Sequence, residues 1–131
     1  MVSRRNFASG TAWEPLAGYS RAVRVGPYVH VSGTTATGEN EQIEGSGDAA
    51  VQTRQCIKNI ETVLVQAGAT LSDVVRTRMY VANIDDWRDI AEVHREFFAS
   101  IRPATTMVEV SRLISPDILV EIEADAYVGS E

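Results

Sequence analysis

The spacing of apolar residues along the chain predicts two amphipathic helices. In the first, between Asp48 and Gly68, apolar residues recur every three or four positions and so share one stripe of a helix. Asp48 is a suitable N-cap, and Gly68 supplies the left-handed residue that often follows a helix end. The second helix is expected to begin at Asp85 or Asp86 and to end before Pro103. The expected inward residues are Cys56, Ile57, Ile60, Val63, Leu64 and Ala67 in the first helix, and Trp87, Ile90, His94, Phe97 and Phe98 in the second.

Alternation of apolar and polar residues predicts five strands. Residues 22–31 alternate on both sides of the turn Gly26-Pro27, which indicates a hairpin of two short strands. Further strands are expected at 73–82, 104–112 and 118–128. Residues 1–17 mix Ser, Gly, Ala and Pro without periodicity, so we expect a loosely structured N-terminal segment there.

The predicted order β-β-α-β-α-β-β is that of an α+β domain. Right-handed strand–helix–strand connections place both helices on one face of a single sheet. In the last strand Val120, Ile122 and Ala124 are expected to meet the helices, which leaves polar residues on the opposite face. A face of that polarity is either solvated or packed against other subunits. Its expected members are Arg76, Arg78, Tyr80, Thr105, Met107, Glu109, Glu121, Glu123 and Asp125.

Composition narrows the function classes. The 131 residues, 44% hydrophobic and 23% charged, are typical of one globular domain spanning 1–131. The net charge of −6 and the scattered basic residues argue against a nucleic-acid partner. The chain has neither the apolar run of a secretory signal nor the roughly 20 apolar residues that span a bilayer, so we expect a cytoplasmic protein without a membrane partner. Cys56 is the single cysteine, and no metal-ligand spacing or phosphate loop is present, so no metal or cofactor is expected.

A set of short motifs runs in order through residues 17–128. The motifs are Tyr19-Ser20-x-Ala22-Val23-x-Val25-Gly26, Val31-Ser32-Gly33, Gln52-Thr53-x-Gln55 followed by Asn59, Ala67-Gly68-Ala69-x-Leu71-x-Asp73-Val74-Val75, Pro103-Ala104-x-Thr106-x-Val108-Glu109-Val110 and Val120-Glu121-Ile122-Glu123-Ala124. Each motif is weak alone, but the ordered set is specific. Together they resemble the motifs of the YjgF/RidA family, also described as endoribonuclease L-PSP-like.

This resemblance implies a chorismate-mutase-like fold that assembles as a homotrimer. The sheets of such a trimer line a central barrel, and a small-molecule site lies in each cleft between subunits. The best-known activity of the family is hydrolysis of reactive enamines and imines to 2-keto acids and ammonia. By the same resemblance, Glu121 is the glutamate that positions water and Tyr19 closes the pocket. The backbone at Ser32 and Gly33 approaches the ligand.

Plainer roles remain open for these residues. Glu121 is either a general base or a cross-strand partner of Arg76 or Arg78. Tyr19 either lines the site or packs against its own subunit, and Gly33 also suits a strand-ending turn. Trp13 either covers the cleft or packs on its own subunit.

One position departs from the family pattern. The family arginine that grips the substrate carboxylate falls on Thr105, and Met107 lies on the same predicted face. Because a charge-assisted bond contributes about 1.5–3 kcal/mol, we expect classical 2-iminoacid deamination to be weakened or altered. The expected function is therefore a trimer that binds or acts on a carbonyl, imine or enamine metabolite. The alternative is a non-enzymatic ligand-binding or interaction protein, and RNA cleavage is disfavoured by the acidic charge.

Three further residues are candidates for the ligand site that lacks the family arginine. Arg78 or Arg102 can replace the lost anchor, although Arg78 equally suits an ion pair with Glu121 or Glu123, and Arg102 solvent exposure. His94 is either a proton shuttle or a hydrogen-bonded packing residue.

Overall fold

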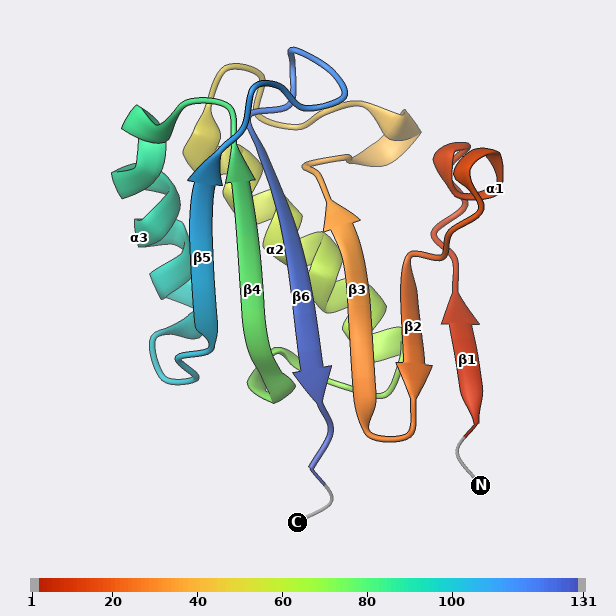
Figure 1. Ribbon diagram of the computed structural model, residues 1–131. Coiled ribbons are helices and arrows are strands. Elements are labelled where there is room, and N and C mark those ends of the chain that lie inside the picture. Colours follow the sequence, from red (N-terminus) through yellow and green to blue (C-terminus); the bar gives the residue numbers. More distant parts are fainter. Residues whose placement is uncertain (1–2, 130–131) are drawn as a thin grey trace.

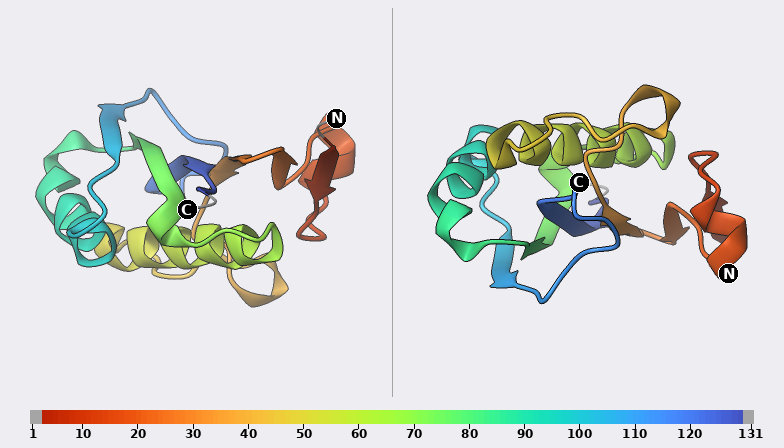
Figure 2. Two further views of the ribbon diagram at one scale, coloured as in Figure 1. Left: turned by 90° about the horizontal axis from the view of Figure 1, so that it is seen from below. Right: turned by 90° about the horizontal axis from the view of Figure 1, so that it is seen from above.

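The protein forms a single six-stranded sheet with two long helices against one face (Figures 1 and 2). The computed structural model describes residues 3–129. The strands are β1 (Arg4–Phe7), β2 (Ala22–Val25), β3 (Tyr28–Thr34), β4 (Val74–Val81), β5 (Ala104–Glu109) and β6 (Val120–Tyr127), and the helices are α1 (Trp13–Ala17), α2 (Ala49–Gln66) and α3 (Trp87–Phe98). Their order in the sheet is β1-β2-β3-β6-β4-β5, with β4 and β5 parallel and all other neighbours antiparallel. The predicted α+β class with one sheet is confirmed, and α1 is a third helix that the pattern did not predict.

The core lies between the sheet and helices α2 and α3. Every residue of the predicted α2 stripe is buried, and the Asp48 side chain accepts a hydrogen bond from the Val51 amide at 3.1 Å. Gly68 has the expected positive φ of 83°. In α3, Ile90 and Phe98 are buried as predicted, but Trp87 is 47% exposed because it opens the helix at the molecular surface. The prediction of Trp87 as a core residue was wrong.

Residues 3–17 contain a short strand and a short helix, where the sequence predicted a loose segment over 1–17; residues 1–2 lie outside the described residues. Strand β1 pairs antiparallel with β2 at the sheet edge, and α1 follows it. The buried carboxylate of Glu14 accepts hydrogen bonds from the Ser9 amide, the Ser9 hydroxyl and the Thr11 hydroxyl. Burial alone would raise the pKa of Glu14, but these hydrogen bonds outweigh it and hold the pKa below its usual value. These bonds fold the segment on itself, and the pairing of β1 with β2 attaches it to the domain.

The two faces of the sheet follow the prediction in β6 and most of β4. Val120, Ile122 and Ala124 are buried under the helices, and Glu123 and Asp125 lie on the opposite face. The alternation that assigns Arg76 and Arg78 to the polar face also assigns Val75 to the helix side. Val75 is instead 52% exposed and Val74 is buried, because the pairing register shifts between Val74 and Arg76.

The face prediction for β5 was wrong. Thr105 stands directly opposite Thr77, and Met107 opposite Met79, both of which are buried residues of β4. Thr105 and Met107 therefore lie on the helix side of the sheet, together with Glu109. Strand β5 is at the sheet edge with most positions exposed, so burial there did not distinguish one face from the other.

Two polar residues of α2 hold the loops at the upper end of the sheet. The Gln52 side chain is fully buried; its Nε2 donates to the carbonyls of Gly45 (3.2 Å) and Asp117 (2.9 Å), and its Oε1 accepts from the Leu119 amide at 2.8 Å. Asn59 donates to the carbonyls of residues 35 and 37 at 3.0 and 2.8 Å. These bonds join segments far apart in the sequence.

Gln52→Leu is expected to lower the free energy of unfolding by about 3 kcal/mol. It leaves two carbonyls and one amide, all partly buried, without their partner, and each such group costs about 1–3 kcal/mol unless it finds another. Urea unfolding measures the change. Gln66→Leu, on the exposed face of the same helix, is the control and should change the free energy by less than about 0.5 kcal/mol. An equal effect of both substitutions would contradict the anchoring role.

Between residues 3 and 129, no helix combines the length and the apolar character needed to cross a membrane.

Candidate functional site

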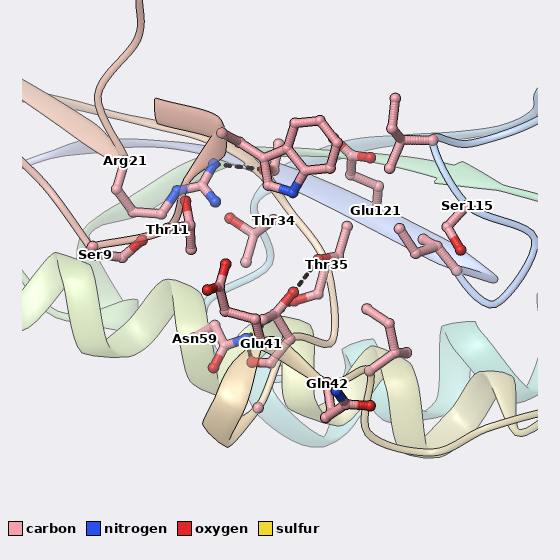
Figure 3. A pocket seen from close by; sticks show the side chains of 18 of the residues that line it. Ser9, Thr11, Arg21, Thr34, Thr35, Glu41, Gln42, Asn59, Ser115 and Glu121 are labelled. Atoms are coloured by element: carbon pink, nitrogen blue, oxygen red, sulfur yellow. Dashed lines mark hydrogen bonds between the residues drawn. The ribbon is translucent and has the colours of Figure 1, made fainter. Parts of the chain in front are cut away.

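A cavity of about 980 Å³ opens where β3 continues beyond Ala22, the first residue of the antiparallel strand β2. The last pair between these strands is Ala22 with Val31, so Gly33 and Thr34 have no neighbour in β2. Four segments supply the walls: the residues around α1, the end of β3 with the following loop, the second half of α2, and the loop before β6. Figure 3 shows Arg21 and Glu121 on the sheet side of the cavity and Asn59 on the helix side.

Glu121 is a half-buried carboxylate in the cavity wall. Its carboxylate packs against the Cα of Gly33, where an added Cβ would overlap Oε2 and lie 3.1 Å from Cδ. Burial raises the pKa of Glu121; the positive charge of Arg21 opposes this rise and the negative charge of Glu123 adds to it. A carboxylate with a raised pKa is better able to accept a proton from water than an ordinary surface glutamate.

Glu121 forms none of the ion pairs found among residues 3–129. Its cross-strand neighbour is Tyr80, whereas Arg76 stands opposite Asp125 and Arg78 opposite Glu123. The alternative role of Glu121 as a partner of either arginine is therefore not observed.

Arg21 is a wall residue that sequence reasoning missed. One terminal nitrogen donates to the Gly33 carbonyl at 2.6 Å, and the guanidinium carbon lies 5.7 Å from the centre of the Tyr19 ring. Its Nε is buried without a hydrogen-bond partner. The only signal in the sequence was alternation, which turns Arg21 away from the core because Ala22 points into it.

The model of the Endoribonuclease L-PSP family matches residues 9–128. The chain belongs to this family. Among curated relatives, a RutC family protein of Pyrococcus abyssi is 39% identical over 114 residues, covering 87% of this chain and 89% of the relative. The 3-aminoacrylate deaminase RutC of Acinetobacter baylyi is 38% identical over 114 residues, covering 87% and 90%.

Solved structures of the family have the same fold. Rv2704 from Mycobacterium tuberculosis, described as a member of the YjgF/YER057c/UK114 family, is 56% identical with a TM-score of 0.88, covering 96% of this chain and 100% of that one. Escherichia coli TdcF with bound serine is 26% identical with a TM-score of 0.79, covering 95% and 94%. The resemblance to the YjgF/RidA family is thus confirmed.

Three of the family positions predicted from the sequence meet in the cavity. Tyr19, Gly33 and Glu121 all line it, and so does Trp13. Ser32 does not line the cavity; its hydroxyl donates to the Ser20 carbonyl at 2.7 Å and so supports the segment that carries Tyr19.

Thr105 and His94 lie together on the helix side of the sheet, outside this cavity. The Thr77 hydroxyl donates to the Thr105 hydroxyl at 2.7 Å and lies 2.9 Å from Nε2 of His94. Burial lowers the pKa of His94, whose ring lies 4.6 Å from that of Phe98. These contacts fit the hydrogen-bonded packing role. Met107 packs against the core on the same side.

Neither arginine considered as a replacement anchor lines the cavity of its own chain. Arg78 pairs with Asp125 at 3.0 Å and with Glu123 at 3.7 Å on the open sheet face. Arg102 is exposed, and its Nε donates to the Ala99 carbonyl at 3.0 Å. The plainer alternatives stated for these two residues match the contacts within one chain.

No group of three or more His, Cys, Asp or Glu side chains in residues 3–129 is arranged to hold a metal ion. The available chemistry in this part of the chain is that of a carboxylate, a guanidinium and several hydroxyl and amide groups.

Cys56 is expected to be inert toward thiol reagents in the native protein. Burial raises the pKa of its thiol, and the charge of Glu121 raises it further, so almost no thiolate exists at pH 8. Ellman's reagent should report no free thiol until guanidinium chloride unfolds the chain, and one thiol afterwards. Rapid modification of the native protein would contradict the structural role of Cys56.

Proposed function

We propose that this protein hydrolyses a small imine or enamine metabolite to a carbonyl compound and ammonia, with Glu121 activating the water. The observation that carries the proposal is the half-buried Glu121 carboxylate, held against Gly33 in the cavity wall with a raised pKa and no ion-pair partner among the described residues. The activity named for the Acinetobacter baylyi relative, deamination of 3-aminoacrylate, supports the choice of an enamine. The bound serine named for the Escherichia coli structure supports a ligand of similar size.

The reaction needs one water and no cofactor. The enamine first tautomerises to the imine, and water then attacks the imine carbon while Glu121 takes a proton from it. The carbinolamine that forms loses ammonia after the nitrogen is protonated, and the remaining proton leaves the oxygen as the carbonyl forms. Glu121 thus acts as a base first and as an acid later.

The proposal includes a homotrimer in which each cavity is completed by a neighbouring subunit. The open sheet face supports it, because that face carries a polar network unsuited to a monomer core but suited to contact with other copies. In it Asp125 binds both Arg78 and His30, and Glu123 accepts from the Tyr80 hydroxyl at 3.0 Å. We propose that the edge strand β5, with Thr105 at the position of the family arginine, contributes to the neighbouring cleft and alters substrate preference.

Ammonia release from freshly generated 2-iminopropanoate and 2-iminobutanoate tests the activity, and light scattering at micromolar concentration tests the assembly. Release above the uncatalysed rate supports hydrolysis. Stabilisation of the fold by metabolites without turnover would instead favour a non-enzymatic binding protein. A monomeric mass would overturn the intersubunit part of the proposal. Binding to RNA that weakens steeply with salt would favour a nucleic-acid role instead.

A further inference from the structure

We infer that Arg21 is the anion anchor of the cavity and selects ligands that carry a carboxylate. The inference rests on the proposed function, because it names the substrate class of the same cavity: small 2-oxo or 2-imino carboxylates. It assigns recognition of the ligand's negative charge to a residue in the cavity wall of the same chain. This residue lies near the edge of the sheet opposite to β5 and its Thr105.

The Arg21 guanidinium forms no direct ion pair within residues 3–129, although the carboxylates of Glu14 and Glu121 are near enough to feel its charge. Arg21 is half-buried. Its only hydrogen-bond acceptor there is the Gly33 carbonyl, which is neutral. A partly desolvated guanidinium is stabilised by a carboxylate, with which it forms two parallel charge-assisted hydrogen bonds.

The guanidinium is also fixed in place before any ligand arrives. The bond to Gly33 and the contact with the Tyr19 ring hold it from two directions. Its Nε is buried without a partner, and its second terminal nitrogen makes no hydrogen bond to residues 3–129, so donors of the guanidinium remain for a ligand. Figure 3 shows the guanidinium turned into the cavity beside Thr34. Such preorganisation lowers the entropy cost of binding.

Arg21 and Glu121 lie on either side of the same residue, Gly33. Both contact Gly33, Arg21 through its carbonyl and Glu121 through its Cα, and the charge of Arg21 lowers the pKa of the Glu121 carboxyl against the effect of burial. A carboxylate held by Arg21 therefore places the adjacent imine carbon on the side of the cavity where Glu121 lies. The carboxyl and imine groups of a 2-imino acid are joined directly, which suits two protein groups that share one residue as a neighbour.

Isothermal titration calorimetry with 2-oxobutanoate and its methyl ester tests the inference, since the two probes differ in the negative charge. Wild-type protein should bind 2-oxobutanoate at least tenfold more tightly than the ester. Arg21→Gln should weaken 2-oxobutanoate binding by about 10–100-fold and leave ester binding within about twofold. Arg88→Gln, which removes an exposed arginine of α3 outside the cavity, is the matched control and should keep the wild-type preference.

Three outcomes overturn the inference: equal binding of both probes by the wild type, an unchanged preference in Arg21→Gln, or loss of the preference in Arg88→Gln. If Arg21→Gln does not fold by circular dichroism, Arg21→Lys decides. A preference reduced at least threefold supports the planar guanidinium contact, and an unchanged preference overturns it. Ammonia release is measured separately: a carboxylate preference that depends on Arg21 without turnover would reject the hydrolysis and leave the anchor standing.

Discussion

Glu121→Gln is expected to lower ammonia release from 2-iminobutanoate by about 10²–10⁴-fold, the usual contribution of a positioned general base. The amide has nearly the same shape as the carboxylate but cannot take a proton from water. Steady-state ammonia assays at neutral pH measure the loss. Light scattering should show the same assembly as for the wild type, because Glu121 makes no ion pair among the described residues.

The pH dependence gives an independent check of this role. Burial raises the pKa of Glu121, so the wild-type rate should fall on the acid side around a value above that of an ordinary glutamate. A raised folded-state pKa also means that the folded protein binds the proton more tightly than the unfolded chain. The ionised carboxylate therefore reduces stability at neutral pH, and Glu121→Gln should not lower the melting temperature there. A lowered melting temperature with unchanged turnover would assign Glu121 to structure alone.

Gly33→Ala is expected to reduce turnover by about 10²-fold with little change in stability. The new Cβ would overlap the Glu121 carboxylate and displace it, and a shift of about 1 Å at a reacting group can cost about this much. The atom that must move is the end of a flexible side chain, so the free energy of unfolding should change by less than about 1 kcal/mol. Ammonia assays and urea unfolding measure the two effects.

Gly129→Ala is the matched control, because a Cβ at Gly129 meets nothing within 4 Å. It should leave both turnover and stability unchanged. Full activity in Gly33→Ala would show that the carboxylate position against Gly33 does not matter for the reaction. A large loss of stability would show that Gly33 serves the backbone of β3 instead.

The long elements were predictable because burial repeats regularly along them. The stripe from Cys56 to Ala67 and the alternation in β6 each leave several consecutive signals of the same period. Strand β5 was assigned to the wrong face because its position at the sheet edge leaves it mostly exposed, so polarity carried little information about direction. The four residues of β1 and the five of α1 are too few for a period to be recognised.

The candidate site was only partly predictable. Glu121, Gly33 and Tyr19 followed from the family resemblance, and the structure brings them to one cavity. Arg21 was missed because its importance comes from tertiary structure: β3 runs past β2, and the guanidinium fills the side of the strand left without a neighbour. No local pattern in the sequence indicates where one strand extends beyond its neighbour in the sheet.

The ordered N-terminal segment also affects how this scaffold can diversify. Its attachment to the domain depends on the short pairing of β1 with β2, and the bonds around Glu14 hold the segment in shape. Ser9, Thr11 and Trp13 form one wall of the cavity. Helices α2 and α3 and the central strands do not depend on which side chains occupy that wall. Evolution, or a protein engineer, can therefore change the shape of the cavity by substituting a few residues near the start of the chain, without repacking the core.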